Sequence, residues 1–426
     1  MLDLKKIDGP YGIPIYYQRM PEMVKSVSMA WVMFTGASDD MSIGLPGLHH
    51  WFEHVPFRGT KKFPKGSADI EGPFVSMNGD INAFTDQTST CYHGTFHVSQ
   101  WRQGLETLTD MVANPLITES GVEAERRVIH QEIIGKLGSA KGKASYNLLG
   151  LLYPEHQFGH PVLGSEKTLA GMDANTLQHA HKAGYDRSRA MLVFIGSVPE
   201  EEFLREALIA CSELPARGLS ERRKPYFHGS LPEWSRRETV IETEFASSVI
   251  HLLFPLPGNM GEVEKIAENT FSSLCLDGMF EHGGLTSPLS RIVREERQLV
   301  YGAATVWTIY PGGGYYGFKA EAKKENIEAI IQAFRDVIQD PAVKMPERLA
   351  QVKSSTRAEM EMEAVNTDDY LMGGINIYKR NGGVMKSAQE YLDAFTQVTI
   401  DDIERMHALV VNPANARLVV FKGMGS

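Results

Sequence analysis

The chain repeats part of its own sequence, and this repeat constrains the fold more than any other feature. SMAWVMF at residues 28–34 has a counterpart in SVIHLLF at residues 248–254, an offset of 220 (248 minus 28). AMLVFIG at residues 190–196 returns as ARLVVFKG at residues 416–423, an offset of 226 (416 minus 190). All four segments are rich in the β-branched and apolar residues of buried strands. A repeat at this distance indicates two homologous halves.

The boundary between the halves is expected near residues 215–235. The stretch ELPARGLSERRKPYFHGSLPEWSRRET is rich in Pro, Gly and charge, which is typical of a linker. We therefore predict an N-terminal domain over residues 1–215, a linker over 216–235 and a C-terminal domain over 236–426. Each half mixes short β-branched strands with longer amphipathic helices and lacks regular βαβ alternation, which predicts an α+β fold.

Composition limits the kinds of molecule that the protein can bind and the cellular compartment in which it is expected. The net charge of −10, without a basic block to contact phosphates, argues against nucleic acid or an anionic membrane as the main partner. Cys91, Cys211 and Cys275 are odd in number and widely spaced, so neither a disulfide framework nor a thiolate zinc site is indicated. The first twelve residues lack the apolar core of a signal peptide. Unless a leader was removed beforehand, we expect a cytoplasmic location.

Residues 50–54 read HWFEH, an H-x-x-E-H pattern that points to metal chemistry. On a helix, His50 and His54 lie one turn apart on the same face, and Glu53 lies beside them within reach of a shared ligand. Apolar residues at helical spacing would anchor the opposite side of this helix: Leu48, Trp51, Phe52 and Val55. The apolar side thus leaves the polar face free for chemistry.

The neighbours of the motif refine this prediction. His49 is the rival ligand, but it points well away from the polar face, so we assign His50 as the ligand. Pro46 suits the first turn of the helix, with Ser42 or Gly44 as possible caps. A five-residue pattern that specifies three positions also occurs by chance, so the motif alone does not decide between a metal site and coincidence.

A catalytic zinc site needs a third protein ligand and an open position. The segment at residues 119–137, ESGVEAERRVIHQEIIGKL, has helical periodicity, and Glu125 and Glu132 fall on its apolar side. That apolar side consists of Val122, Val128, Ile129 and Ile133. Burying an ionised carboxylate without a partner costs several kcal/mol, so two of them predict a cation close by. Salt bridges to Arg126 or Arg127 are the alternative, although both arginines point off this side.

These segments together carry a family resemblance. GLHHWFEHVPFRGTKKFP, followed 78 residues after His54 (132 minus 54) by Glu132 in EAERRVIHQE, resembles the pitrilysin-type zinc metallopeptidases, also called inverzincins. The resemblance implies that His50, His54 and Glu132 bind one zinc ion per chain. It also implies that Glu53 is the general base and that Glu125 supports the site. For the fold, it implies that each half is an antiparallel sheet packed with helices.

The resemblance also implies substrate contacts. NAFT at residues 82–85 resembles the family's edge strand, in which Asn82 and Ala83 would pair with an extended peptide. Arg294 and Tyr301, seven residues apart in VREERQLVYG, resemble the arginine and tyrosine pair that reaches the active site from the other half of the chamber. The pair would hold the substrate carbonyl and stabilise the oxyanion. The alternatives are a surface salt bridge for Arg294 and a packed strand position for Tyr301.

Short members of this family act as dimers that close a chamber around unfolded peptides, and their arginine and tyrosine reach the partner's zinc. Since this chain carries both sets of residues, the resemblance implies a homodimeric zinc endopeptidase with two composite sites. Two alternatives stay open. One is a processing subunit that needs a paralogous chain as its partner, and the other is a non-catalytic structural relative.

Several positions depart from the family pattern or from the repeat. His49 stands where the family has a small residue, and Pro56, in HVPF, is expected to end the motif helix early. In the second half, residues 280–282 echo Phe52-Glu53-His54, but Gly278 replaces the first histidine, so no second zinc site is expected. The glycines at 312–314 predict a hairpin turn.

Overall fold

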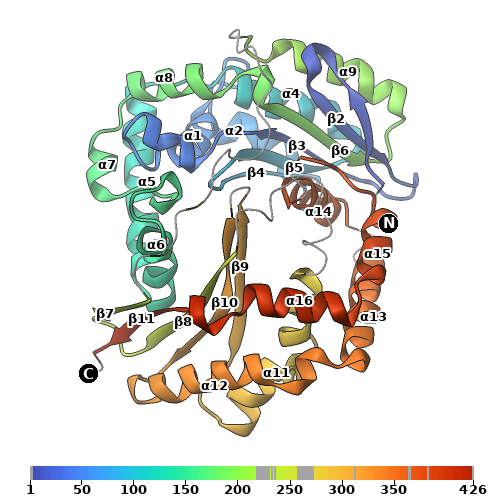
Figure 1. The fold of residues 1–426 in the computed structure, drawn as a ribbon. Coiled ribbons are helices and arrows are strands. Elements are labelled where there is room, and N and C mark those ends of the chain that lie inside the picture. The colour runs from blue at the N-terminus through green and yellow to red at the C-terminus, as the bar shows by residue number, and fades with distance from the viewer. Residues whose placement is uncertain are drawn as a thin grey trace.

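The computed structural model of this chain describes residues 3–216, 231, 234, 237–256, 273–310, 313–362, 366–380 and 383–424. It contains two sheets, each covered by helices (Figure 1). Most of the predicted linker at 216–235 lies outside the described residues, so the proposed domain boundary stays a prediction.

The N-terminal half forms a six-stranded sheet in the order β1-β2-β6-β3-β5-β4. Its strands are β1 (Lys5–Asp8), β2 (Pro14–Arg19), β3 (Ser26–Met33), β4 (Asp80–Thr85), β5 (Thr90–His97) and β6 (Ala190–Gly196). The strand β4 lies at one edge of this sheet, and all neighbours are antiparallel except β2 and β6, which are parallel.

The C-terminal half forms a five-stranded sheet in the order β7-β11-β8-β10-β9. Its strands are β7 (Glu238–Thr243), β8 (Ser248–Leu256), β9 (Ala303–Tyr310), β10 (Gly313–Ala322) and β11 (Arg417–Gly423). This order matches β2-β6-β3-β5-β4 strand for strand, and the repeated segments fall on β3 and β8 and on β6 and β11. The predicted duplication is therefore confirmed in the topology.

The expectation of purely antiparallel sheets was wrong. Each sheet contains one parallel pair, β2 with β6 and β7 with β11. In each half the last strand returns after a long helical connection and lies beside the first strand of the repeat. A connection of that length can join parallel neighbours, which a tight hairpin cannot.

Helices cover both sheets. In the N-terminal half they are α1 (Leu48–His54), α2 (Ser67–Ile70), α3 (Gly72–Val75), α4 (Trp101–Ala113), α5 (Glu119–Leu137), α6 (Ala140–Leu152), α7 (Glu166–Ala170), α8 (Ala174–Gly184) and α9 (Glu200–Glu213). In the C-terminal half they are α11 (Pro288–Ser290), α12 (Ile327–Gln339), α13 (Pro346–Met362), α14 (Thr367–Arg380), α15 (Ala388–Gln397) and α16 (Ile400–Val410), and residues 273–281 are also helical. The main core of each half lies between its sheet and these helices.

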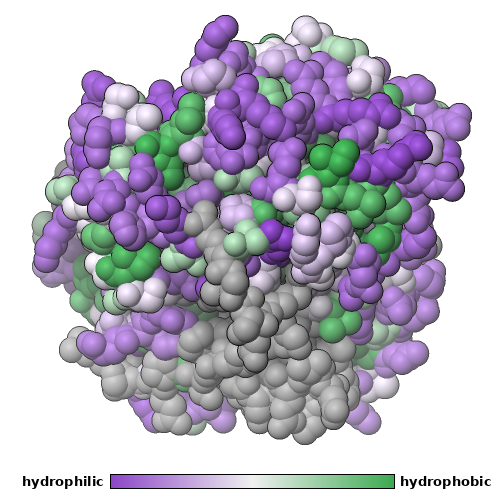
Figure 2. All heavy atoms as spheres, turned by 90° about the horizontal axis from the view of Figure 1, so that it is seen from above, coloured by the Kyte–Doolittle hydropathy of each residue, from purple (hydrophilic) through white to green (hydrophobic). Residues whose placement is uncertain are grey.

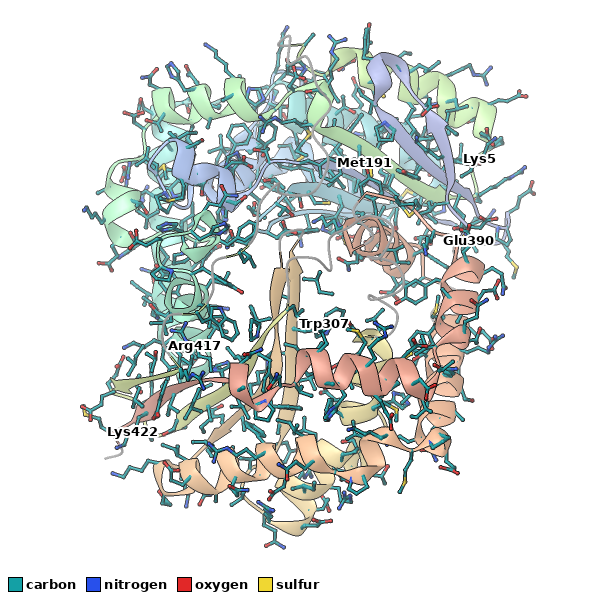
Figure 3. The ribbon with its side chains drawn as sticks, in the orientation of Figure 1. Lys5, Met191, Trp307, Glu390, Arg417 and Lys422 are labelled. Atoms are coloured by element: carbon teal, nitrogen blue, oxygen red, sulfur yellow. The ribbon has the colours of Figure 1, made fainter. Side chains whose placement is uncertain are left out.

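Each half also contributes one helix that packs against the sheet of the other half. From the C-terminal half, α14 packs against β3 and β6, where its Leu371 and Ile375 are buried with Val32. From the N-terminal half, α6 packs against β8 and β11. There, Arg417 Nη2 donates to the carbonyl of Leu151 at 2.7 Å (Figure 3). Each sheet is thus completed by a helix from the other half.

The outer surface is mixed in character. On the face that Figure 2 shows, most side chains are hydrophilic and the hydrophobic ones gather in a few separate patches. Within the described part of the chain, no helix combines the length and the hydrophobicity that crossing a membrane requires.

Candidate active site

The motif is helical in α1, as predicted, but this helix starts differently from the expectation. Its N-cap is Gly47, with φ of 95°, so the expectations of Pro46 in the first turn and of Ser42 or Gly44 as the cap were wrong. The φ value lies in the left-handed region, which favours glycine. A Cβ on Gly47 would also come within 2.7 Å of the Cα of Gly164. A close backbone contact, rather than a side-chain cap, determines where α1 begins.

The predicted apolar side of α1 is confirmed. Its four residues are each at most 1% exposed: Leu48, Trp51, Phe52 and Val55. The α-helix stops at His54, two residues before Pro56, and the chain continues as a 3-10 helix over Val55–Arg58. The early end expected from Pro56 is therefore also confirmed.

A buried carboxylate holds the start of α1. Asp40 accepts hydrogen bonds from the backbone N–H of Gly47 at 2.8 Å and of His49 at 3.1 Å. His49 points away from the motif face, as predicted, with Nδ1 2.5 Å from Asp40 and Nε2 2.8 Å from the hydroxyl of Thr35. The sequence of contacts from Asp40 through His49 to the Thr35 hydroxyl resembles the carboxylate, histidine and hydroxyl of a hydrolase triad. All three side chains are buried, so a substrate does not reach them. Their role is to fix the helix.

The metal-binding residues predicted from sequence come together. Glu132 Oε2 on α5 lies 3.5 Å from His50 Nε2 and 3.6 Å from His54 Nε2. Donor atoms of His50, Glu53 and His54 lie within 4.8 Å of one another, and no other such group of His, Cys, Asp or Glu occurs among the described residues. Glu132 on α5 therefore lies beside the polar face of α1 that carries His50 and His54.

Glu125 lies behind the ligands. Its Oε2 is 2.9 Å from His54 Nδ1, which leaves Nε2 of that ring directed at Glu132. Its Oε1 accepts a hydrogen bond from Arg58 Nε. Arg126, the alternative partner considered from sequence, donates instead to the carbonyls of Leu169 and Met172. A carboxylate that orients a histidine in this way is a common support of metal ligands.

The prediction that α5 buries both carboxylates was half wrong. Glu125 is 4% exposed, whereas the side chain of Glu132 is 40% exposed and Val128 is 39% exposed. The reason is that α5 keeps Ile129 and Ile133 in the core, while Glu132 lies on another side of the same turns and borders a cleft, which Gly135 and Lys136 also line. Glu132 therefore faces the cleft and not the protein interior.

Burial and charge set the protonation of these groups. Burial, together with the neighbouring His54, lowers the pKa of His50 to about 3, so this imidazole is neutral and can act as a ligand. Burial would raise the pKa of Glu125, but His54 and Arg58 hold it below its usual value. Burial raises the pKa of Glu53. The site thus offers one neutral imidazole, one charged supporting carboxylate and a carboxyl with enhanced basicity.

These residues fit a zinc ion. His50, His54 and Glu132 offer two imidazole nitrogens and one carboxylate, which leave one position open in a four-coordinate site. A buried atom beside them, Glu53 Oε2, has no hydrogen-bond partner in the described part of the chain. Buried polar atoms are normally satisfied, so a cation and solvent belong in this space.

The site opens into a cleft of about 800 Å³. Its lining includes His50, Glu53, Thr85, Gln87, Glu132, Tyr146, Leu149, His160, Val162 and Leu163. The strand β4 ends in this cleft at Thr85 and forms the edge of its sheet, as predicted for the NAFT segment. The backbone N–H of Ala83 donates to Asn82 Oδ1 at 2.8 Å, so it points away from the ladder with β5.

Arg294 and Tyr301 meet each other but not the metal site. Arg294 lies in the π-helix Arg291–Glu296, and its guanidinium carbon lies 4.8 Å from the ring centroid of Tyr301. Tyr301 is 88% exposed, so it is not a packed strand residue. Arg294 does form an ion pair with the adjacent Glu295 at 3.3 Å, as in the alternative reading of the sequence. Neither residue lines the cleft that contains Glu53, so their role stays a prediction.

The second half keeps counterparts of Glu53 and His54 but lacks the first histidine of the motif. Gly278 stands where the first histidine would be, and a Cβ there would meet Val352 Cγ1 at 2.5 Å. Glu281 accepts hydrogen bonds from the backbone N–H and the hydroxyl of Thr305. Nearby, β9 and β10 pair from Tyr310 opposite Gly313, which confirms a hairpin here. Gly313 and Gly314 lie in β10 and not in the turn, and Gly312 lies outside the described residues.

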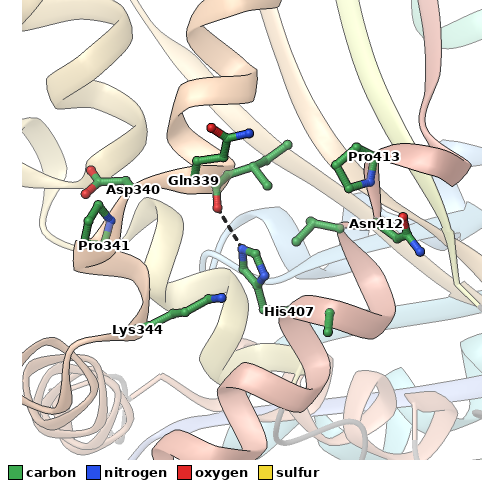
Figure 4. A pocket seen from close by; sticks show the side chains of 10 residues that line it. Gln339, Asp340, Pro341, Lys344, His407, Asn412 and Pro413 are labelled. Atoms are coloured by element: carbon green, nitrogen blue, oxygen red, sulfur yellow. Dashed lines mark hydrogen bonds between the residues drawn. The ribbon is translucent and has the colours of Figure 1, made fainter.

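A further pocket, of about 430 Å³, lies between the ends of α12 and α16 (Figure 4). His407 faces it and is 2.8 Å from the carbonyl of Ile338 through Nε2. The N-terminal half contains the same contact, His181 Nε2 to the carbonyl of Val112 at 2.9 Å. The same pairing in both halves identifies His407 as a structural residue that satisfies a helix end.

Several site residues were missed in the sequence. Arg58, Asp40, Thr85 and Gln87 contact or support the cleft, but none was given a role: Arg58 and Thr85 lie within quoted motifs, and Asp40 and Gln87 lie outside them. Arg58 follows His54 by one turn, so helical spacing could have indicated it. The others come from turns and strand ends, whose partners depend on tertiary contacts.

Comparisons with known proteins agree with this geometry. Residues 22–146 match the model of the insulinase family (peptidase family M16), and residues 171–353 match that of the peptidase M16 inactive domain. An uncharacterized zinc protease of Streptomyces coelicolor is 23% identical over 410 residues, which are 92% of this chain and 84% of that protein. The mitochondrial-processing peptidase subunit beta of Blastocladiella emersonii is 24% identical over 222 residues, 52% of this chain and 47% of that protein. The crystal structure of a protease from Helicobacter pylori superposes with a TM-score of 0.85 at 15% identity, covering 99% of this chain and 100% of that one.

Proposed function

Since the chain belongs to the insulinase family of peptidases, family M16, we propose that it is a zinc-dependent endopeptidase that cleaves unfolded peptides. The observation that carries the proposal is the convergence of His50 and His54 on one oxygen of Glu132, with Glu53 beside them. His50, His54 and Glu132 would hold one zinc ion per chain. When bound, zinc supplies Lewis acidity and makes water acidic enough to act as a nucleophile at neutral pH.

The protein groups then have distinct tasks. Glu53 takes the proton from the attacking water and delivers it to the leaving amine, a role for which burial raises its pKa in the useful direction. Glu125 orients His54 through Nδ1. The free edge of β4, at Asn82 and Ala83, would bind the substrate backbone as an added strand.

Arg294 and Tyr301 would act in a second subunit. Because they do not line the cleft of their own chain, we propose that they reach the cleft of a partner copy in a homodimer and stabilise the oxyanion there. Dimerisation and the cytoplasmic location remain proposals based on sequence. A processing subunit with a paralogous partner is the second candidate, favoured by the likeness to a mitochondrial-processing peptidase subunit.

Two variants test the proposed function. Glu53→Gln is expected to keep zinc but to lose about 10² to 10⁴ in kcat, because it removes only the proton carrier. His54→Ala is expected to lose both zinc and activity. Zinc is measured by elemental analysis after gel filtration, and hydrolysis by mapping cleavage of a peptide mixture. Hydrolysis by Glu53→Gln at the wild-type rate would overturn the role of Glu53, and a zinc-free wild-type chain would overturn the function.

A further inference from the structure

The turn between β4 and β5, which borders the catalytic cleft, contacts a lysine from the C-terminal half of the chain. Lys379 lies at the end of α14, the C-terminal helix that packs on the N-terminal sheet. Its Nζ is 2.6 Å from Asp86 Oδ2, donates to the hydroxyl of Ser89, and lies 5.4 Å from the ring centroid of Phe84. The lysine side chain is 14% exposed and that of Asp86 is 42% exposed, so this ion pair is partly shielded from water.

Asp86 organises the turn between β4 and β5. Its Oδ1 accepts hydrogen bonds from the backbone N–H groups of Thr88 and Ser89, both at 2.8 Å. Its backbone carbonyl accepts one from Ala37 at 3.0 Å. Burial would raise the pKa of Asp86, but Lys379 holds it below its usual value, so the carboxylate stays charged. Lys379 therefore neutralises the one charge around which this turn is built.

The same turn carries two residues of the cleft. Thr85 precedes Asp86 and lines the cleft with Glu53, and its hydroxyl donates to the carbonyl of His49 on α1 at 3.4 Å. Gln87 follows Asp86, and its Nε2 donates to the carbonyl of His160 across the cleft at 3.2 Å. A displacement of the turn would move both residues relative to the general base.

We infer that Lys379 is a positioning residue: by docking α14 onto Asp86, the C-terminal half sets the turn that places Thr85 and Gln87 in the catalytic cleft. The kinetic part of this inference rests on the proposed peptidase function, and the structural part does not. The proposed metal ligands lie on α1 and α5, whereas Lys379 contacts Asp86, Ser89 and Phe84 at the turn between β4 and β5. Loss of the ammonium should therefore disturb the turn and spare zinc binding.

The chain offers a matched control. Lys143 on α6 forms another ion pair between the halves, with Nζ 2.7 Å from Glu244 Oε2, and it has no contact with the turn. Lys379→Met and Lys143→Met therefore remove equivalent charges. We expect Lys379→Met to lower kcat about tenfold, since small displacements in an active site are costly, while zinc content stays unchanged. Lys379→Arg should restore at least half of kcat, and Lys143→Met should retain kcat.

Hydrogen–deuterium exchange of residues 80–90 supplies a readout that does not depend on activity. Exchange should be faster in Lys379→Met than in the wild-type chain and unchanged in Lys143→Met. Equal loss of kcat in both variants, or unchanged exchange at 80–90 in Lys379→Met, would overturn the inference. If the wild-type chain hydrolyses no peptide, the exchange result still decides. Should Lys379→Met fail to fold, Asp86→Asn is used in its place, with the same expectations.

Discussion

Arg58 ends a series of contacts that begins at the metal site. His54 presents Nε2 to Glu132, its Nδ1 lies 2.9 Å from Glu125, and Glu125 in turn accepts from Arg58. Arg58 thus holds the Glu125 carboxylate in place, and Glu125 in turn orients the ring of His54. Outer partners of this kind commonly contribute tenfold to a hundredfold in metal affinity.

We predict that Arg58→Ala lowers zinc affinity by about tenfold or more, because Glu125 loses the partner that holds it against His54. The measurement is a zinc titration in competition with a chromogenic chelator. Arg127, an exposed arginine on α5, is the control, and Arg127→Ala should bind zinc like the wild-type chain. Equal affinities in the two variants would mean that Arg58 does not support the site.

Local spacing explains why the three residues of the motif could be predicted to lie together. His50, His54 and Glu53 share one face of a single helical turn, and helical periodicity is a property of adjacent residues. The exposure of Glu132 could not be predicted in this way, because it depends on which side of α5 borders the cleft after the halves have packed. The contact between Arg58 and Glu125 joins residues 67 positions apart and belongs to the tertiary structure.

At the level of elements, β4 combines two tasks. It pairs with β5 on one side and leaves its other side open beside α1. Since the N–H groups of a strand alternate in direction, the outward N–H of Ala83 implies that the N–H of Phe84 points into the ladder. The two neighbouring residues should therefore respond differently to the loss of an N–H group.

We predict that Ala83→Pro raises KM about tenfold and leaves kcat and zinc content nearly unchanged, because it removes a donor only from the free edge. Phe84→Pro is the contrasting variant, and it should lower the melting temperature, since proline breaks a ladder hydrogen bond. Steady-state kinetics and thermal unfolding measure the two effects. An unchanged KM in a folded Ala83→Pro variant would show that substrates do not pair with β4.

Elements differ in how well the sequence predicts them. The repeated segments mark β3, β8, β6 and β11 correctly because buried strands have a local signature. The parallel pairs and the packing of α6 and α14 against the sheet of the other half have no local signature, since they depend on which surfaces meet after the strands form. The start of α1 at Gly47 was also missed, because a close approach to Gly164 determines it.

For the whole molecule, the duplication shows how one half has the candidate metal site and the other half lacks it. Both halves keep the sheet order and the histidine that caps a helix end, His181 in one and His407 in the other. The C-terminal half has lost the first metal ligand at Gly278, and Glu281 binds Thr305 instead. This half presents Arg294 and Tyr301 beside each other, with Tyr301 exposed on its surface.

The proposed homodimer leads to a complementation test at this scale. In a dimer whose sites take Arg294 from the partner, Glu53→Gln and Arg294→Ala chains are each inactive alone. A mixed dimer regains one working site, which combines Glu53 of one chain with Arg294 of the other. Random exchange of equal amounts makes about half of the dimers mixed, so about a quarter of wild-type activity should return.

Exchange is followed by mass spectrometry of differently tagged chains, and activity by cleavage of a quenched fluorescent peptide. A Glu53→Gln chain mixed with His54→Ala is the control, since both changes affect the same zinc site and mixed dimers should stay inactive. If Glu53→Gln and Arg294→Ala exchange subunits without regaining activity, the arginine does not act across the dimer. If the purified wild-type chain is monomeric and inactive, the paralogous-partner alternative takes the place of the homodimer.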